Sequence, residues 1–134
     1  HIPCIYIICI YMESAMSRTI KLKRVYEAPA ASDGTRILVD RLWPRGIAKE
    51  KAKIDLWLKD IAPSDAPRKR FHGHPEDWDA FRKAYAAELK DAGDAVKELR
   101  RHLRKGTVTL LYAARDEEHN NAVALKQWLG RKAR

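Results

Sequence analysis

The stretch that decides the fold is Thr107-Val-Thr-Leu-Leu-Tyr-Ala-Ala-Arg-Asp-Glu-Glu-His-Asn-Asn-Ala122. It begins with a short apolar run rich in β-forming residues, continues through a charged loop, and leads into a helical pattern. A strand that feeds a helix through a short loop is the unit from which parallel α/β sheets are built. Because the first N–H groups of such a helix point into the loop, this segment favours an anion at that end of the sheet.

A second apolar run, Arg36-Ile-Leu-Val-Asp40, leads into Arg41-Leu-Trp-Pro-Arg-Gly46. This pattern is typical of a buried strand that a Pro/Gly turn ends. Ligands of open α/β sheets bind beyond the carboxyl ends of the strands. We therefore expect the loops 40–46 and 113–121 to face one cleft.

The remaining pattern supplies the other strands and the helices. Alternation over residues 19–25 predicts an edge or near-edge strand, and residues 47–53 and 54–58 predict a helical turn followed by a third strand. Helices are predicted at 65–71, from Pro75 through Leu89, over 95–105, and from His119 or Asn120 onward. The predicted fold class is α/β, a single layered domain with a mostly parallel sheet flanked by helices.

The first sixteen residues differ from the rest of the chain. Residues 2–11 are nearly all apolar, no Lys or Arg precedes Arg18, and both cysteines, Cys4 and Cys9, lie here. A membrane span needs about 20 apolar residues, and a secretory signal needs a basic start. We interpret residues 1–16 as an extraneous appendage and residues 17–134 as the domain. Such a domain holds no thiol, which favours a reducing cytoplasm, and we expect no membrane partner.

The chain of 134 residues is 34% charged and carries a formal charge of +9, so anionic partners are favoured over cationic ones. Basic clusters at 68–70, 100–101, 104–105 and 131–134 are typical of solvated helix faces. They leave a nucleic-acid-binding or regulatory module open as an alternative function. The oligomeric state is left open as well.

The two loops carry residue types that bind oxyanions. Arginine grips a carboxylate or phosphate bidentately, and amide side chains extend such a donor set. The candidate ligand-binding residues are Arg41, Arg45, Arg115, Asn120, Asn121, Tyr112 and Trp43, with the indole of Trp43 as a wall for a planar ligand. The alternatives are that the arginines brace the loops through Asp40, Asp116 or Glu117, and that Tyr112 only packs.

Two residues are candidates for proton transfer. His119 stands near a helix start beside acids that could orient it, and Asp40 ends a strand. A capping histidine and a local Asp–Arg salt bridge are the alternatives. The sequence has no Gly-rich phosphate loop, no Ser elbow and no zinc-protease motif, and the pair His72 and His74 lacks a nearby third ligand. We therefore expect no metal and no cofactor, and both a metal-free enzyme and a binding protein stay open.

Several motifs carry a resemblance to a known family. They include Leu38-Val-Asp-Arg-Leu-Trp-Pro-Arg-Gly46, Trp57-Leu-Lys-Asp-Ile-Ala-Pro-Ser64 and Thr109 through Ala122. From about Met16 to Gly130 the chain resembles the YeaO-like branch of the domain of unknown function 488 family. The resemblance implies a small cytoplasmic bacterial α/β protein and brings no established activity. Other branches carry a cysteine near the end of the last strand and Cys-His-Arg at the helix start. This chain has Tyr112 and His119-Asn120-Asn121 there, so no thiol-based reaction is expected.

Overall fold

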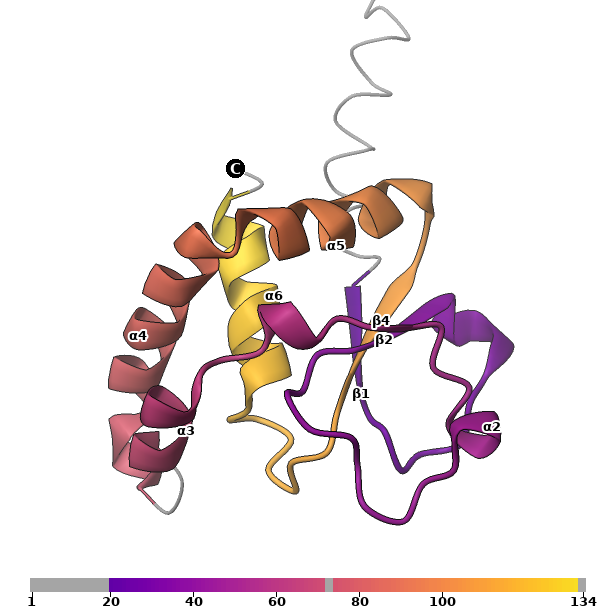
Figure 1. The fold of residues 1–134 in the computed structure, drawn as a ribbon, viewed down its shortest axis with the longest axis horizontal. Coiled ribbons are helices and arrows are strands. Elements are labelled where there is room, and N and C mark those ends of the chain that lie inside the picture. The colour runs from indigo at the N-terminus through magenta and orange to yellow at the C-terminus, as the bar shows by residue number, and fades with distance from the viewer. Residues whose placement is uncertain (1–19, 72–73, 133–134) are drawn as a thin grey trace, which may run out of the picture.

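A computed structural model describes residues 20–71 and 74–132, where a sheet of four parallel strands forms the centre of the fold (Figure 1). The strands are β1 (Ile20–Arg24), β2 (Thr35–Leu38), β3 (Leu56–Trp57) and β4 (Val108–Tyr112), in the order β1-β4-β2-β3. All residues of β4 are buried, and the hydroxyl of its Thr109 donates to the carbonyl of Asp33 at 2.7 Å. The predicted α/β fold with a parallel sheet is confirmed, with β1 at an edge.

The helices follow the predicted order along the chain. They are α2 (Lys49–Ala52), α3 (Asp65–Phe71), α4 (Trp78–Asp91), α5 (Gly93–Lys105) and α6 (Asn121–Lys132), with single 3-10 turns η1 (Ala31–Asp33), η2 (Lys59–Ile61) and η3 (Pro75–Asp77). The helix predicted from Pro75 starts with the η3 turn and becomes α-helical at Trp78. The third strand is shorter than the predicted 54–58, although backbone hydrogen bonds to β2 continue at both of its ends, from Asp55 to Arg36 and from Leu58 to Leu38. The carboxylate of Asp55 also accepts the N–H of Arg36 at 2.8 Å.

Helices α3 to α6 lie on one side of the sheet, and the long segment that carries α2 lies on the other (Figure 1). Side chains alternate along a strand, so β2 and β4 each supply both faces. Ile37 and Leu110 pack under the helices, whereas Leu38 and Leu111 face the opposite layer. The buried helical residues Phe81, Tyr85, Leu89, Leu99, Leu103, Leu125 and Leu129 complete the larger core.

The opposite layer is built by residues 41–57 rather than by a long helix. Trp43, Ile47, Ile54 and Trp57 pack on Leu38 and Leu111. The two indole rings meet edge to face at 5.6 Å, and each indole N–H donates to a backbone carbonyl, of Ile47 and of Asp40 respectively. These contacts fix the loop that follows β2 although it has little regular structure.

A buried polar cluster closes the amino end of the sheet. Asp33 and Arg36 are each 4% exposed, and their side chains pair at 2.6 Å. The guanidinium of Arg36 also donates to the carbonyls of Ala52 and Lys53, and Lys23 lies 3.2 Å from Asp33. Burial opposes ionisation of Asp33, but the N–H of Ala30 and these two cations lower its pKa below the ordinary value. Arg36 is thus a structural residue, remote from the loops after β2 and β4.

Two sequence predictions fall on other parts of the chain. The appendage proposed for residues 1–16 and the side chain of His72 lie outside the described residues. Within the described ranges, every helix is too short or too polar to cross a lipid bilayer.

Candidate functional site

A cleft of about 770 Å³ lies where β1, β2 and β4 end. The loops that follow these three strands form its rim, and α3 and α4 contribute one wall. The volume is in the range of small-molecule sites, roughly 300–1,000 Å³. The parallel strands explain the position, because all their carboxyl ends meet at the same edge of the sheet.

This cleft brings together eight of the nine residues that the sequence singled out, namely Asp40, Arg41, Trp43, Arg45, Arg115, His119, Asn120 and Asn121. The ninth, Tyr112, is 3% exposed and does not line it. Its hydroxyl hydrogen-bonds to the side chain of Asn120, and burial raises the pKa of Tyr112. This placement favours the packing role for Tyr112.

Three arginines, Arg41, Arg45 and Arg115, line the rim of the cleft. All three are exposed. Among the described residues, no salt bridge joins any of them to an acid. The sequence left open that these arginines brace the loops through Asp40, Asp116 or Glu117. The described contacts include no such pair. A cleft with unpaired guanidinium groups attracts oxyanions.

A fourth arginine, Arg68 of α3, also lines the cleft and was missed from the sequence. It donates to Asp65 at 2.9 Å in an exposed pair, and its charge partly offsets the rise that burial causes in the pKa of Asp40. The basic run 68–70 was interpreted as a solvated helix face. The sequence spacing could have indicated this position, because Arg68 stands three residues before Phe71 and lies on the same side of the helix.

Asp40 holds the two rim loops together. One carboxylate oxygen accepts the N–H of Ala113 and the other accepts the amide of Asn121, each at 2.9 Å. Burial raises the pKa of Asp40, against the lowering effect of these two hydrogen bonds and of Arg68. Both carboxylate oxygens are thus engaged inside the protein, which favours a positioning role over that of a general base.

The two asparagines shape the start of α6. Asn120 accepts the N–H of Val123 through its side-chain oxygen and donates to the carbonyl of Asp116, both at 2.9 Å, so it is the helix N-cap. Asn121 donates to the carbonyl of Val39 and to Asp40. The amide donors that the sequence offered to a ligand are therefore used within the protein, and the arginines remain as the cationic side chains that line the cleft.

The loop before α6 also binds its own carboxylate. One oxygen of Asp116 accepts the N–H groups of Glu118 and His119, at 2.9 and 3.0 Å. These two N–H groups, and then the side chain of His119, lower the pKa of Asp116. The backbone donors expected to attract a ligand near the helix start are thus partly occupied by Asp116.

His119 is oriented by its neighbours. Its Nδ1 lies 3.1 Å from the second oxygen of Asp116, and its ring stands edge-on to Trp78 with 5.2 Å between the ring centres. A carboxylate on Nδ1 fixes the ring and its tautomer. The Nε2 atom is then the nitrogen that can bind a ligand or exchange a proton at the cleft wall.

Arg24, at the end of β1, is a further residue that the sequence did not reveal. Its guanidinium donates to the carbonyls of Ala114 and Ala113, at 3.0 and 3.3 Å, and lies 5.1 Å from the ring centre of Tyr26. It holds the loop that carries Arg115. Alternation alone marks Arg24 as one more polar strand residue.

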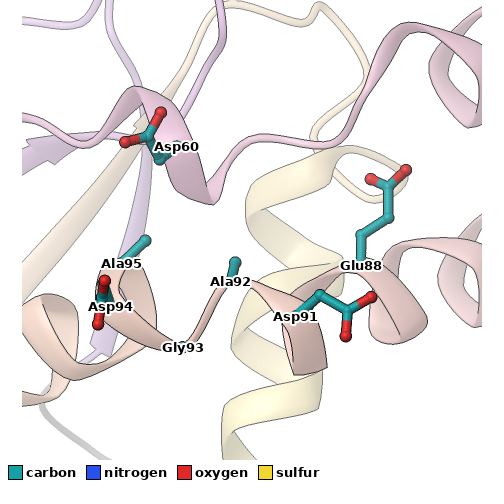
Figure 2. Close-up of a pocket in the computed structure, with 7 residues that line it drawn as sticks. All are labelled: Asp60, Glu88, Asp91, Ala92, Gly93, Asp94 and Ala95. Atoms are coloured by element: carbon teal, nitrogen blue, oxygen red, sulfur yellow. The ribbon is translucent and has the colours of Figure 1, made fainter.

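A second hollow, of about 450 Å³, is acidic (Figure 2). Asp60, Glu88, Asp91 and Asp94 line it, and Figure 2 shows their carboxylates pointing in different directions. Glu88 accepts the backbone N–H of Ser64 at 2.9 Å and also its hydroxyl. Among the residues that the structure describes, no group of three His, Cys, Asp or Glu side chains is arranged to hold a metal ion.

Comparison with known proteins places this chain in a family. A family model described as "Inactive DUF488-N3 subclade" matches residues 19–134. The chain belongs to this family. It is 47% identical over 110 residues to the "Uncharacterized protein YeaO" of Escherichia coli strain K12, across 82% of this chain and 96% of that protein. It is 40% identical over 110 residues to the "Uncharacterized protein Rv3073c" of Mycobacterium tuberculosis strain H37Rv, across 82% of this chain and 92% of the relative. No solved structure gives a match. The YeaO-like resemblance seen in the sequence is confirmed.

Proposed function

We propose that this member of the DUF488-N3 subclade binds a small phosphate- or carboxylate-bearing ligand in the cleft, in the cytoplasm. The observation that carries the proposal is the set of rim arginines, Arg41, Arg45 and Arg115, which have no acidic partner among the described residues. With Arg68, four guanidinium groups face the cleft against the two carboxylates of Asp40 and Asp116. This surplus of positive charge favours an anion.

Binding is favoured over catalysis by three features of the site. Both oxygens of Asp40 are engaged, the amides of Asn120 and Asn121 are used structurally, and both cysteines lie in residues 1–16. The word "Inactive" in the family description agrees with this proposal. With its Nδ1–H directed at Asp116, His119 then offers Nε2 as an acceptor for a ligand hydroxyl rather than carrying out a proton-transfer step.

The proposal is tested by calorimetric titration and thermal melting of the full chain with inorganic phosphate and citrate. Removal of one charge-assisted contact costs about 1.5–3 kcal/mol. Arg45→Ala and Arg115→Ala are therefore expected to weaken binding at least about tenfold. Arg104→Ala is the matched control, since it removes the same charge from α5 outside the cleft. Ligand that binds the folded state raises Tm, so wild type and Arg104→Ala should melt higher with ligand.

Two outcomes would overturn the proposal. One is the absence of any anion-dependent shift, and the other is an equal shift in Arg45→Ala and Arg104→Ala. The alternative, nucleic-acid binding through the basic outer faces, predicts instead a shift with short DNA or RNA that ignores Arg45 and falls steeply with salt. Of the basic clusters on those faces, 100–101 already has Arg101 paired with Glu98 of its own helix.

A further inference from the structure

The cleft exposes apolar surface beside its arginines. Tyr26 and Leu42, which are 46% and 64% exposed, are the exposed large hydrophobic residues of the described chain, and both line this cleft. A single exposed leucine on a protein surface needs no explanation. Two such side chains at the mouth of the same cleft mark a surface suited to apolar contact.

The inner wall continues this apolar surface. Phe71 of α3 and Phe81 of α4 line the cleft with their ring centres 5.2 Å apart, and Pro44 and Pro63 lie beside them as buried lining residues. None of these four side chains offers a hydrogen bond. Phe71 is half-buried and the other three are buried, so an inorganic anion at the arginines would leave the accessible part of Phe71 without an apolar partner.

Cationic and apolar groups interleave on the same short segments. Leu42 stands between Arg41 and Arg45 in the loop after β2, and Arg68 and Phe71 are one helical turn apart on α3. A volume of about 770 Å³ also far exceeds what a phosphate or carboxylate group fills. Both features fit a ligand that joins a charged head to a carbon skeleton.

We infer that the ligand is an amphipathic small anion, a carboxylate or phosphate monoester on a hydrophobic skeleton. The arginines bind its head, and Leu42, Tyr26 and Phe71 cover its apolar part. This inference rests on the proposed anion-binding function and names the class of ligand that the same cleft accepts.

The test is the affinity of the full chain for a series of straight-chain carboxylates, from acetate through butyrate and hexanoate, and for methyl, butyl and hexyl phosphate. Burial of one methylene contributes about 0.8 kcal/mol, which is roughly fourfold in affinity. We expect binding to tighten by about two- to fourfold for each added methylene. Arg45→Ala should weaken every member of a series by a similar factor and leave the dependence on chain length unchanged.

Leu42→Ser separates the apolar surface from the charge. Leu42 is exposed, so the fold should tolerate the change, and inorganic phosphate should bind as in the wild type. The gain per methylene is expected to fall by half or more. Phosphate binding without any gain along the series would overturn this inference and leave the proposed function standing. Failure of all the anions to bind would remove both.

A membrane lipid is the other source of the same chemistry. Co-sedimentation with vesicles of phosphatidylglycerol and phosphatidylcholine, set against vesicles of phosphatidylcholine alone, distinguishes it. Suppose that the protein binds the anionic vesicles through Arg45 and Leu42 but has no affinity for the free short-chain anions. This result would assign the cleft to a lipid surface and would overturn the inference that the ligand is a small molecule. Affinity for the free anions without vesicle binding supports a small-molecule ligand.

Discussion

The carboxylate of Asp40 and the amide of Asn121 are joined by a hydrogen bond of 2.9 Å, although 81 positions separate them in the sequence. The bond ties the end of β2 to the first residue of α6. A second bond, from the N–H of Ala113 to the other oxygen of Asp40, adds the end of β4. The loops that carry Arg45 and Arg115 are therefore anchored to one half-buried carboxylate, and contacts within the protein hold the rim of the cleft in place.

Asp40 should make stability depend on pH in a direction opposite to that of most carboxylates. Its folded-state pKa is raised by burial above the ordinary 3.8, so the folded protein holds this proton more tightly than the unfolded chain. The stabilisation that Asp40 contributes to the folded state is present at low pH. It is lost as pH rises from about 3.8 through the raised pKa of the folded state.

The measurement is the free energy of unfolding in urea between pH 3.5 and 8 for the wild type and Asp40→Asn. The stability of the wild type minus that of the variant should fall as pH rises and then level off. Asp33 and Asp116, whose pKa values are lowered, titrate in both proteins, so this difference isolates Asp40. A difference that stays flat or rises with pH would contradict the assignment.

Asp33 should be among the most sensitive charged residues for stability. The substitution Asp33→Asn leaves the 4% exposed guanidinium of Arg36 without its carboxylate, and breaking a buried pair typically costs about 3–5 kcal/mol. Urea denaturation at pH 7 measures this loss. Asp79→Asn is the control, because Asp79 pairs with Arg82 at the surface, where its side chain is 76% exposed. The control should change stability by less than about 1 kcal/mol, and equal losses in the two variants would refute the expectation.

The position of the cleft could be predicted from the sequence because it follows from strand patterns. Runs rich in apolar residues lead to Asp40 and Tyr112, parallel strands end together, and the loops after them are charged. The face of the sheet on which the side chain of Tyr112 lies could not be predicted in the same way. A strand buried on both faces has no apolar-polar alternation to give its phase, and Tyr112 lies on the face covered by the helices.

The roles of several polar side chains were also not predicted from the sequence, for a different reason. Asn120, Asn121 and Asp116 are ordinary ligand-binding types, and the three-dimensional contacts show that they satisfy one another and the backbone. Arg68 lines the cleft although it belongs to the basic run 68–70, which is typical of a solvated helix face. The partners of Asn121, Val39 and Asp40, lie more than 80 positions away, and a single sequence does not show which distant segments come into contact. The partners of Asp116 and Asn120 lie within four residues, so turn and helix-cap preferences could have predicted them.

Gly34 should tolerate no side chain. Its φ of 66° is a conformation that L residues rarely adopt, and a Cβ would lie 2.2 Å from the carbonyl oxygen of Thr107. That oxygen accepts the N–H of Thr35, so the clash would push the start of β2 away from β4. Gly34→Ala is expected to cost at least about 2 kcal/mol of unfolding free energy. Gly93→Ala, with nothing within 4 Å of the added Cβ at the start of α5, should be neutral or stabilising by up to about 1 kcal/mol. Thermal and urea unfolding of both variants give the comparison, and a neutral Gly34→Ala would disprove the close contact.

Asp116 should control the order of the loop before α6 through its acceptor oxygen rather than its charge. Asparagine keeps an oxygen that can accept the N–H groups of Glu118 and His119, whereas alanine does not. A hydrogen bond worth about 1 kcal/mol slows amide exchange about fivefold, so exchange at these two amides should quicken by at least that factor in Asp116→Ala and little in Asp116→Asn. Hydrogen exchange followed by NMR at pH 6 resolves both amides. Equal exchange in the two variants would mean that the charge, or the contact of His119 with Trp78, holds the loop instead.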